Sequence, residues 1–496
     1  MNKRDKYKDL IFYEIYPTSF YDSNGDGIGD LLGISEKLGY IKELGFNAIW
    51  LNPFYLSPFH DGGYDVKDFY SVDPRFGNME DYKELLESAH KMGIRVIIDL
   101  VAGHASFENA DFLISAEAER NENSDLFIWN NSVWDLPKGY RLISGMFDRD
   151  GCYMVNFFAH QPAFNYGFKE IEYPDWQMSY LDERCFGASE YMIRVMKYWL
   201  SMGTDGFRVD MADSLVKNDD DKSATIEVWQ YMFEKVRAEY PDAFFVSEWS
   251  NPAQALKAGF DADFVLDHWD NFFHRFVRST EDTRGLAVLN GGEMEVFLKD
   301  LQERLDTARR ENAFLAVISG NHDTPRISDF LDEKRLKLFY LLQFALPGIP
   351  FVYYGDEIGM KTSPLLSKDG GYHRTGVRAP MQWSMDRNMG FSECDNDLYL
   401  PCGLANRNDA DSMIKDENSL YHFLKKLIHI RKEYTGLQEA EYELSEKDRV
   451  LKLKRGDLEL ILNLSDKEVK YEGEVLISTS EKEDVLTSYS GVLIKE

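Results

Sequence analysis

The sequence predicts an α/β fold: a (β/α)8 TIM barrel with a small inserted domain after the third strand and a C-terminal antiparallel β-sandwich domain. Short apolar runs typical of strands alternate with amphipathic helical stretches up to about residue 360, as in a parallel barrel. This alternation stops once, between His104 and Asn165, for an excursion of about 60 residues that exceeds an ordinary connecting loop. Short strands separated by Gly and Asp turns at residues 449–495 indicate the C-terminal domain.

Each element follows from its local pattern. Barrel strands are predicted at residues 10–17, 46–53, 95–101, 206–212, 244–250, 263–269, 314–323 and 349–357. Helices are predicted at 33–45, 79–93, 189–203 and 333–348, several of them ending at Gly. Residues 367–388 are irregular and are predicted to fold back over the barrel mouth. A helix at 417–434 precedes strands at 449–454, 458–464, 474–478 and 491–495. We therefore assign residues 1–104 and 166–425 to the barrel, 105–165 to the inserted domain and 426–496 to the C-terminal domain.

Composition limits the classes of partner. The chain has 496 residues, with 56 Lys and Arg against 86 Asp and Glu, a net charge of −30. This charge disfavours nucleic acid and anionic membranes as partners, whereas neutral carbohydrates are compatible with it. The 4 cysteines form no CxxC pair, so neither a zinc site nor a disulfide framework is indicated. With no signal-peptide pattern and no long apolar run, a cytoplasmic location is predicted, and the oligomeric state is left open.

Carboxylates gather where the predicted barrel strands end. These ends carry Asp99, Asp210, Glu248 and Asp323, accompanied by Arg208, His104 and His322. In a parallel barrel all of these positions meet at one face, where such enzymes keep their active sites. A single acid at a strand end is usually a helix cap or a loop hydrogen-bonding group. Four acids with cationic companions instead indicate a catalytic cluster.

Paired carboxylates in a cleft are typical of glycosidic-bond chemistry. A retaining mechanism needs one ionised nucleophile and one protonated acid. Arg208 and Asp210 alternate with apolar neighbours and should point to the same side of their strand, so Arg208 is expected to keep Asp210 ionised. Glu248, beside Trp249 in an apolar strand, is expected to have a raised pKa.

Four segments resemble the ordered signature regions of the α-amylase superfamily, glycoside hydrolase family 13. They are DLVAGH (99–104), GFRVD (206–210), SEW (247–249) and GNHD (320–323). The resemblance implies that Asp210 is the nucleophile, Glu248 the general acid/base and Asp323 a third carboxylate that binds sugar hydroxyls. It further implies a substrate-binding set at subsite −1, the position of the sugar that is transferred: Asp61, Tyr64, His104, Gln161, Arg208 and His322.

Within this set the resemblance distinguishes several roles. Tyr64 is expected to stack on the sugar, and Asp61 resembles the acid that closes the pocket of exo-acting members. Arg407 is considered as the partner of Asp61. Asp99 matches a structural acid and is not expected to be catalytic.

Two further segments are similar to the oligo-1,6-glucosidase and α-glucosidase-like group. QPAFN (161–165) resembles a fingerprint of that group, and GVRAPMQW (376–383) resembles a segment shared by oligoglucosidases and trehalose synthases. The implied function is retaining hydrolysis of α-glucosidic bonds in short oligosaccharides. Met211 and Ala212 favour α-1,4 over α-1,6 bonds.

Other functions stay open at this point. A glucosyltransferase or isomerase, such as a trehalose synthase or sucrose isomerase, would use the same intermediate, and an α-amylase is a further alternative. An inactive binding protein is disfavoured because all three carboxylates of the triad are present.

The segment DSNGDGIGD (22–30) has the donor pattern of a calcium loop. Oxygen donors recur at every second position: Asp22, Asn24, Asp26, the carbonyl of Ile28, and Asp30. Alternating hard oxygens with glycines for tight turns suit Ca²⁺, and the loop resembles the calcium loop of the same group, which implies a structural ion. Gly103 stands where the family usually has an Asn that supports a calcium between barrel and inserted domain, so a second calcium is left open.

Overall fold

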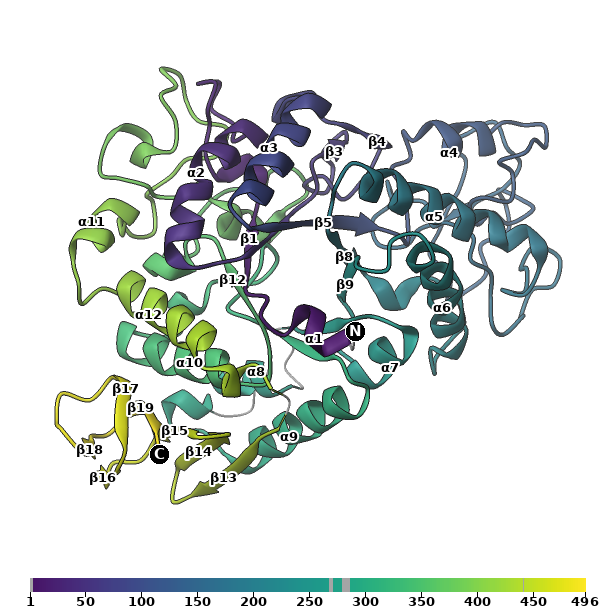
Figure 1. The fold of residues 1–496 in the computed structure, drawn as a ribbon. Coiled ribbons are helices and arrows are strands. Elements are labelled where there is room, and N and C mark those ends of the chain that lie inside the picture. The colour runs from purple at the N-terminus through teal and green to yellow at the C-terminus, as the bar shows by residue number, and fades with distance from the viewer. Residues whose placement is uncertain (1–2, 267–270, 279–285, 440) are drawn as a thin grey trace.

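The computed structural model describes residues 3–266, 271–278, 286–439 and 441–496. Its centre is a closed barrel of parallel strands in the order β1-β12-β11-β10-β9-β8-β5-β2 (Figure 1). The strands are β1 (Phe12–Ile15), β2 (Ala48–Leu51), β5 (Arg95–Val101), β8 (Gly206–Asp210), β9 (Phe244–Ser247), β10 (Ala262–Val265), β11 (Phe314–Ile318) and β12 (Gly348–Tyr353). The predicted barrel is thus confirmed. Positions 267–269 of the sixth predicted strand lie outside the described residues.

The barrel strands form because their sequences are almost continuously apolar. Strand β8 is buried at every position, and β5 at all but its first. Such runs are typical of parallel strands covered on both faces. Charged residues that interrupt them, such as Asp99 and Arg208, therefore need partners inside the barrel.

Helices cover the outside of the barrel (Figure 1). They are α2 (Leu31–Leu44), α3 (Met79–Lys91), α5 (Phe186–Ser201), α6 (Ser223–Arg237), α7 (Pro252–Ala258), α8 (Phe272–Val277), α9 (Glu295–Arg310) and α10 (Glu333–Ala345). The short helix α1 (Lys3–Tyr7) instead lies at the barrel end where the strands begin, with Lys6 donating to Asp242 just before β9. Local signals set their ends. Asp30 caps α2 by accepting from the Gly33 N–H, and Gly45 ends it in the left-handed region at φ 108°.

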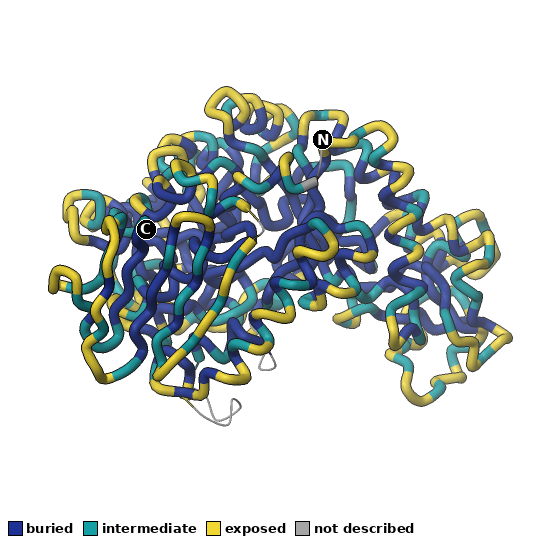
Figure 2. Tube along the Cα trace, turned by 60° about the horizontal axis from the view of Figure 1, so that its bottom comes forward, coloured by how far each residue is buried: buried dark blue, intermediate teal, exposed yellow. Residues whose placement is uncertain are grey.

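The segment between β5 and α5 forms a lobe to one side of the barrel (Figure 2). It contains α4 (Ala110–Ser115) and a short hairpin of β6 (Leu142–Ile143) and β7 (Tyr153–Met154). Aromatic packing replaces regular structure in its core, where Phe112 contacts the rings of Phe127, Trp129 and Tyr153. Another small sheet, β3 (Tyr55–Leu56) with β4 (Asp68–Val72), lies in the connection after β2.

The C-terminal part follows α11 (Ala410–Lys415) and α12 (Leu420–Glu433). Its main sheet is antiparallel, in the order β13-β14-β15-β19-β17. The strands are β13 (Glu443–Lys447), β14 (Val450–Arg455), β15 (Leu458–Asn463), β17 (Glu474–Ser478) and β19 (Ser490–Lys495). A second layer consists of β16 (Val469–Lys470) and β18 (Val485–Leu486), so the sandwich is small.

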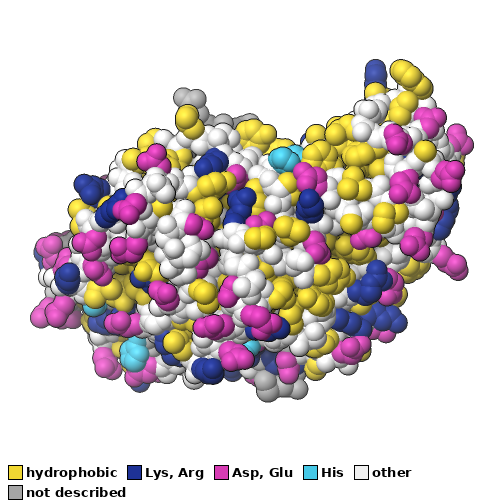
Figure 3. All heavy atoms as spheres, turned by 90° about the horizontal axis from the view of Figure 1, so that it is seen from above, with side chains coloured by type: hydrophobic (Ala, Val, Ile, Leu, Met, Phe, Trp, Pro, Cys, Tyr) yellow, Lys and Arg dark blue, Asp and Glu magenta, His cyan; other side chains and the backbone are white. Residues whose placement is uncertain are grey.

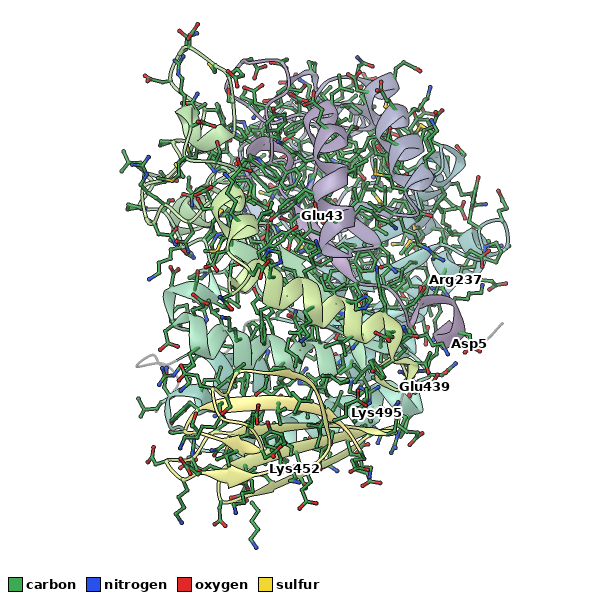
Figure 4. The ribbon with its side chains drawn as sticks, turned by 60° about the vertical axis from the view of Figure 1, so that its left-hand side comes forward. Asp5, Glu43, Arg237, Glu439, Lys452 and Lys495 are labelled. Carbon is green, nitrogen blue, oxygen red and sulfur yellow. The ribbon has the colours of Figure 1, made fainter. Side chains whose placement is uncertain are left out.

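One face of the main sheet packs closely on α10. A Cβ built on Gly491 would come within 2.9 Å of Leu341 and 3.1 Å of Leu338. Figure 4 shows Lys452 and Lys495 on this sheet, with Glu439 in the connection from α12. No helix in the described part of the chain is long and apolar enough to cross a membrane.

Candidate active site

The strand ends enclose a pocket at one end of the barrel. Its volume is about 320 Å³, and it is lined by Asp61, Tyr64, His104, Phe157, Asp210, Met211, Asp213, Glu248, Trp249, Leu266, Asp323 and Arg374. Figure 3 shows the surface hollowed between the main body and the projecting lobe, with hydrophobic side chains along the side of the hollow next to the lobe. The three predicted catalytic carboxylates are therefore brought together.

Arg208 is the electrostatic centre of the site. Its buried guanidinium contacts three carboxylates: Nη1 lies 2.5 Å from Asp99 Oδ1 and 3.0 Å from Asp210 Oδ1, and Nη2 lies 2.8 Å from Glu248 Oε1. The barrel register explains the first contact, because Asp99 on β5 pairs with Arg208 on β8. Asp99 also accepts from Trp50 Nε1 and the Tyr64 hydroxyl, which is the structural role expected of it.

Burial and a neighbouring acid act on the charge of Asp210 together with Arg208. Burial, and then the neighbouring Glu248 carboxylate, raise the pKa of Asp210 well above its usual value against the opposing effect of Arg208. Arg208 favours the ionised form of Asp210, as expected, but its single charge is divided among three carboxylates. The two acids are therefore expected to titrate as a coupled pair.

The backbone after the nucleophile strand is strained and contacts the acid. Met211 follows Asp210 in the left-handed region at φ 42°, which is costly for a residue with a side chain. Its N–H donates to Glu248 Oε2 at 2.9 Å. This contact joins the end of β8 to the residue that follows β9 and fixes one Glu248 oxygen.

Asp323 is ionised by a ring of cations. Its Oδ1 accepts from Arg374 Nη1 at 3.0 Å and from Arg378 Nη2 at 2.8 Å, and its Oδ2 lies 3.2 Å from His322 Nε2. Burial opposes ionisation, but His322, Arg378 and Arg374 outweigh it and hold the pKa of Asp323 well below its usual range. Asp323 therefore stays negative as an acceptor for hydroxyl groups.

Asp61 and Asp323 are bridged by one arginine. Arg374 Nη2 donates to Asp61 Oδ1 at 2.8 Å, while Nη1 reaches Asp323. Arg374 was missed in the sequence because it lies in the irregular segment 367–388. The pairing of Arg407 with Asp61 considered above is wrong, because the Arg407 guanidinium instead lies 3.9 Å from Met389 Sδ. Gln161 is fully buried behind Asp61, donating to its Oδ2 at 2.8 Å, and does not line the pocket.

His104 and Tyr64 form another wall of the site. His104 Nε2 lies 3.1 Å from the Tyr64 carbonyl oxygen, and burial lowers the pKa of His104 to about 3, so the imidazole is neutral. The Tyr64 ring stacks on His322 with centroids 5.1 Å apart. The outer lining by Phe157, Trp249 and Leu266 was not predicted, because these residues come from separate segments without a common pattern.

The structure gives a steric reason for Gly103. A Cβ at this position would lie 2.6 Å from Asn156 Nδ2 and 3.0 Å from Ser214 Oγ. Asn156, in the lobe, donates to Ser214 Oγ and accepts from Lys217 Nζ at 2.7 Å. Lys217 also donates to the Ser214 carbonyl, so its amino group connects the lobe to the loop after β8; burial lowers its pKa to about 7.

The 22–30 loop is closed by its own hydrogen bonds. Asp22 Oδ1 accepts from the Gly25 N–H and Oδ2 from the Gly27 N–H, both at 2.7 Å. Asp30 is turned toward the start of α2, accepting from Ser23 and Gly33. Among the described residues no group of three His, Cys, Asp or Glu side chains is arranged to hold a metal. The oxygen donors suit Ca²⁺ in kind, and calcium binding stays a prediction.

A parallel barrel with paired acids and a third carboxylate at its strand ends defines an enzyme that acts on glycosidic bonds. Residues 14–440 match the family described as Alpha amylase, catalytic domain. The chain belongs to this family, glycoside hydrolase family 13.

Individual relatives differ in activity. The chain is 32% identical over 474 residues to the trehalose synthase/amylase TreS of Mycolicibacterium smegmatis, covering 86% of this chain and 76% of that protein. It is 28% identical to the glucan 1,6-alpha-glucosidase of Streptococcus pneumoniae, covering 97% and 96%. An inactive double mutant of MutB in complex with isomaltulose has the same fold, with a TM-score of 0.81 at 24% identity over 99% of both chains.

Proposed function

We propose that the protein is a retaining, exo-acting α-glucosidase that releases glucose from short oligosaccharides, with α-1,4 bonds preferred. The observation that carries this proposal is the Asp61–Arg374–Asp323 bridge in the wall of the pocket. A bridge at this position would block a chain that continued past the sugar that is transferred. The pocket, at about 320 Å³, is at the small end of ligand sites, which span ~300–1,000 Å³, and it suits a disaccharide.

The proposed chemistry proceeds in two displacements. An Asp210 oxygen attacks the anomeric carbon while Glu248, acting as the general acid, passes a proton to the glycosidic oxygen as the leaving sugar departs. Glu248 then removes a proton from water, whose oxygen displaces Asp210 from the sugar. Arg208 stabilises the carboxylates throughout, and Asp323, kept ionised, accepts hydroxyl groups of the same sugar.

The second candidate is a glucosyltransferase or isomerase. It is favoured by the similarity to TreS, and it would use the same covalent intermediate with a sugar hydroxyl in place of water. The apolar outer lining from Phe157, Trp249 and Leu266 is where an acceptor sugar would stack. An endo-acting α-amylase fits less well, because a pocket blocked by the Asp61–Arg374–Asp323 bridge would not accept the middle of a chain.

A product time course tests these proposals. Purified protein is incubated with maltose, isomaltose, maltotriose, sucrose and soluble starch, and products are separated by chromatography. Glucose released singly from short α-1,4 sugars, with starch nearly untouched, is expected. Early trehalose, isomaltulose or longer oligosaccharides would show transfer instead. The Asp210→Asn variant should release no glucose while unfolding at the same temperature as the wild type, and turnover by it would contradict the nucleophile assignment.

We further propose that the 22–30 loop binds a structural Ca²⁺. Asp22, Asn24, Asp26, the carbonyl of Ile28 and Asp30 would supply the oxygens. Support comes from the donor spacing and from the tight turns at Gly25 and Gly27, at φ 77° and 92°. The ion would brace the loop and take no part in the chemistry.

A further inference from the structure

Glu14 is a buried carboxylate that the mechanism above does not use. It lies on β1, the first barrel strand, with 1% of its surface exposed. Its Oε1 lies 2.9 Å from His322 Nδ1 and accepts from Asn52 Nδ2 at 3.2 Å. Oε2 has no hydrogen-bond partner among the residues that the structure describes. A buried carboxylate is costly unless a nearby charge compensates it, and His322 is the group in contact.

His322 is held between two carboxylates. Nδ1 lies 2.9 Å from Glu14 Oε1, and Nε2 lies 3.2 Å from Asp323 Oδ2 without a hydrogen bond to any described residue. In a neutral imidazole one of these nitrogens would be unprotonated and partly negative beside a carboxylate, which is repulsive. Only the imidazolium, with a proton on each nitrogen, is attracted by both. We propose that Glu14 is a positioning residue that keeps His322 protonated and thereby keeps Asp323 ionised and oriented toward the sugar.

A competing arrangement must be considered. Asn52 Nδ2 also lies 3.0 Å from His322 Nδ1, and it could donate to that nitrogen if the nitrogen carried no proton. The Glu14 carboxylate would then face a lone pair at 2.9 Å inside a buried site. Burial raises the pKa of Glu14, whereas the nearby His322, Asn52 and Arg208 favour its charged form. When Glu14 is ionised, its charge decides between the two arrangements, because a neutral amide at position 14 would remove the repulsion.

The other neighbours of the ring add little attraction for a proton. Tyr64 and Tyr16 stack near its faces, with centroids 5.1 and 6.4 Å away, and Trp50 meets it edge-on at 5.9 Å. Arg378 Nε donates to the His322 carbonyl, and this cation disfavours a second positive charge. Arg208 and Asp99 lie beyond Asn52 and Tyr64 and carry opposite charges.

The balance favours the protonated ring. Burial disfavours the charged imidazole, but Asp323 and then Glu14 outweigh it and raise the pKa of His322 to about 9. The imidazolium is therefore present at neutral pH and is lost only as pH rises through about 9. Without the Glu14 charge the proton should leave at a lower pH, by about 1–3 units for a contact of this length.

The test measures the titration of His322 directly in the substrate-free protein. Histidine is labelled with ¹⁵N, and ring signals are recorded from pH 5 to 10 in the wild type and in Glu14→Gln. The His322 signal is the one that disappears in His322→Gln. Glu357→Gln is the matched control, because Glu357 is also a buried barrel-end carboxylate, accepting from Tyr13 and Tyr40 away from the pocket.

His322 is expected to remain imidazolium to about pH 8.5 in the wild type and in Glu357→Gln, and to lose its proton at least one unit lower in Glu14→Gln. Glu14→Asp, which restores the charge, should return the pKa of His322 most of the way to the wild-type value.

Equal titration in the wild type and Glu14→Gln, or equal shifts in Glu14→Gln and Glu14→Asp, would overturn the proposal. If Glu14→Gln does not fold, a wild-type His322 that is neutral at pH 7 overturns it. The role given to Asp323 in holding the sugar rests on the proposed function. The titration of His322 does not, because it is measured without substrate.

Discussion

At the scale of single residues, the charges in the site depend on the number of cations in contact with each carboxylate. Arg208 serves Asp99, Asp210 and Glu248, so its single charge is divided among three carboxylates. Asp323, in contrast, has three cationic neighbours, some of them shared with other carboxylates, and these hold its pKa well below the usual range. Two neighbouring parts of one pocket thus differ in how strongly cations favour the charged carboxylate.

Replacement of Arg374 should show most clearly how the pocket carboxylates depend on their cationic neighbours. In Arg374→Ala, Asp61 and Asp323 lose the cation that joins them, and Asp61 is left buried with Gln161 and no direct ion pair. We expect kcat/KM for maltose to fall at least about 30-fold, or ~2 kcal/mol, as for truncation of one member of a buried charge pair. Steady-state kinetics measures this. Arg407→Ala is the control and should stay within about twofold; an equal loss in both variants would refute the assigned bridge.

At the scale of elements, strands were easier to predict from the sequence than the contacts between loops. The barrel strands are continuous apolar runs, and residues that end them, such as Asp210 and Glu248, fall on one face by topology alone. Arg374 and Asp61 are 313 positions apart in irregular segments, where no periodicity relates them. The divided charge of Arg208 could not be predicted either, because it depends on distances within the barrel.

The contact between the lobe and the loop after β8 gives a second prediction. In Lys217→Met the amino group that joins Asn156 to the Ser214 carbonyl is removed. Since Asn156 also contacts His104 Nδ1 at 3.2 Å, we expect about a tenfold loss of kcat/KM. We also expect faster proteolysis within residues 105–165, followed by gel electrophoresis and mass spectrometry. Lys425→Met, which removes an ion pair with Glu43 between α12 and α2, should change neither; unchanged proteolysis in Lys217→Met would argue against this link.

At the scale of the whole molecule, the barrel is enclosed by segments far apart in sequence. The 22–30 loop contacts the chain after the barrel, where Ser392 Oγ donates to Asp22 Oδ2 at 2.6 Å and the Tyr399 N–H donates to the Gly27 carbonyl at 3.1 Å. The C-terminal sheet packs on α10. A bound ion in the first loop would therefore stabilise a region that spans nearly the whole chain.

Removal of calcium is the corresponding test. A chelator should lower the unfolding temperature by at least about 5 °C, because an ion that binds only the folded state adds its binding free energy to stability. Added Ca²⁺ should restore the temperature, as followed by calorimetry. Asp22→Asn should unfold at the lower temperature with or without chelator. A wild type that is indifferent to the chelator would show that the loop is held by its own hydrogen bonds alone.

The strand order of the C-terminal sheet has a consequence for how the protein is made. Strand β19 lies between β15 and β17, and β17 pairs with no other strand of that sheet. During synthesis, β13, β14 and β15 can form a meander as they leave the ribosome, while β17 waits without a neighbour. Until residues 490–495 emerge, β15 and β17 each present an unpaired edge, the state in which a nascent chain is most prone to associate with another. A released chain truncated after residue 489 should therefore combine a folded barrel with a C-terminal sheet that is prone to associate with other chains.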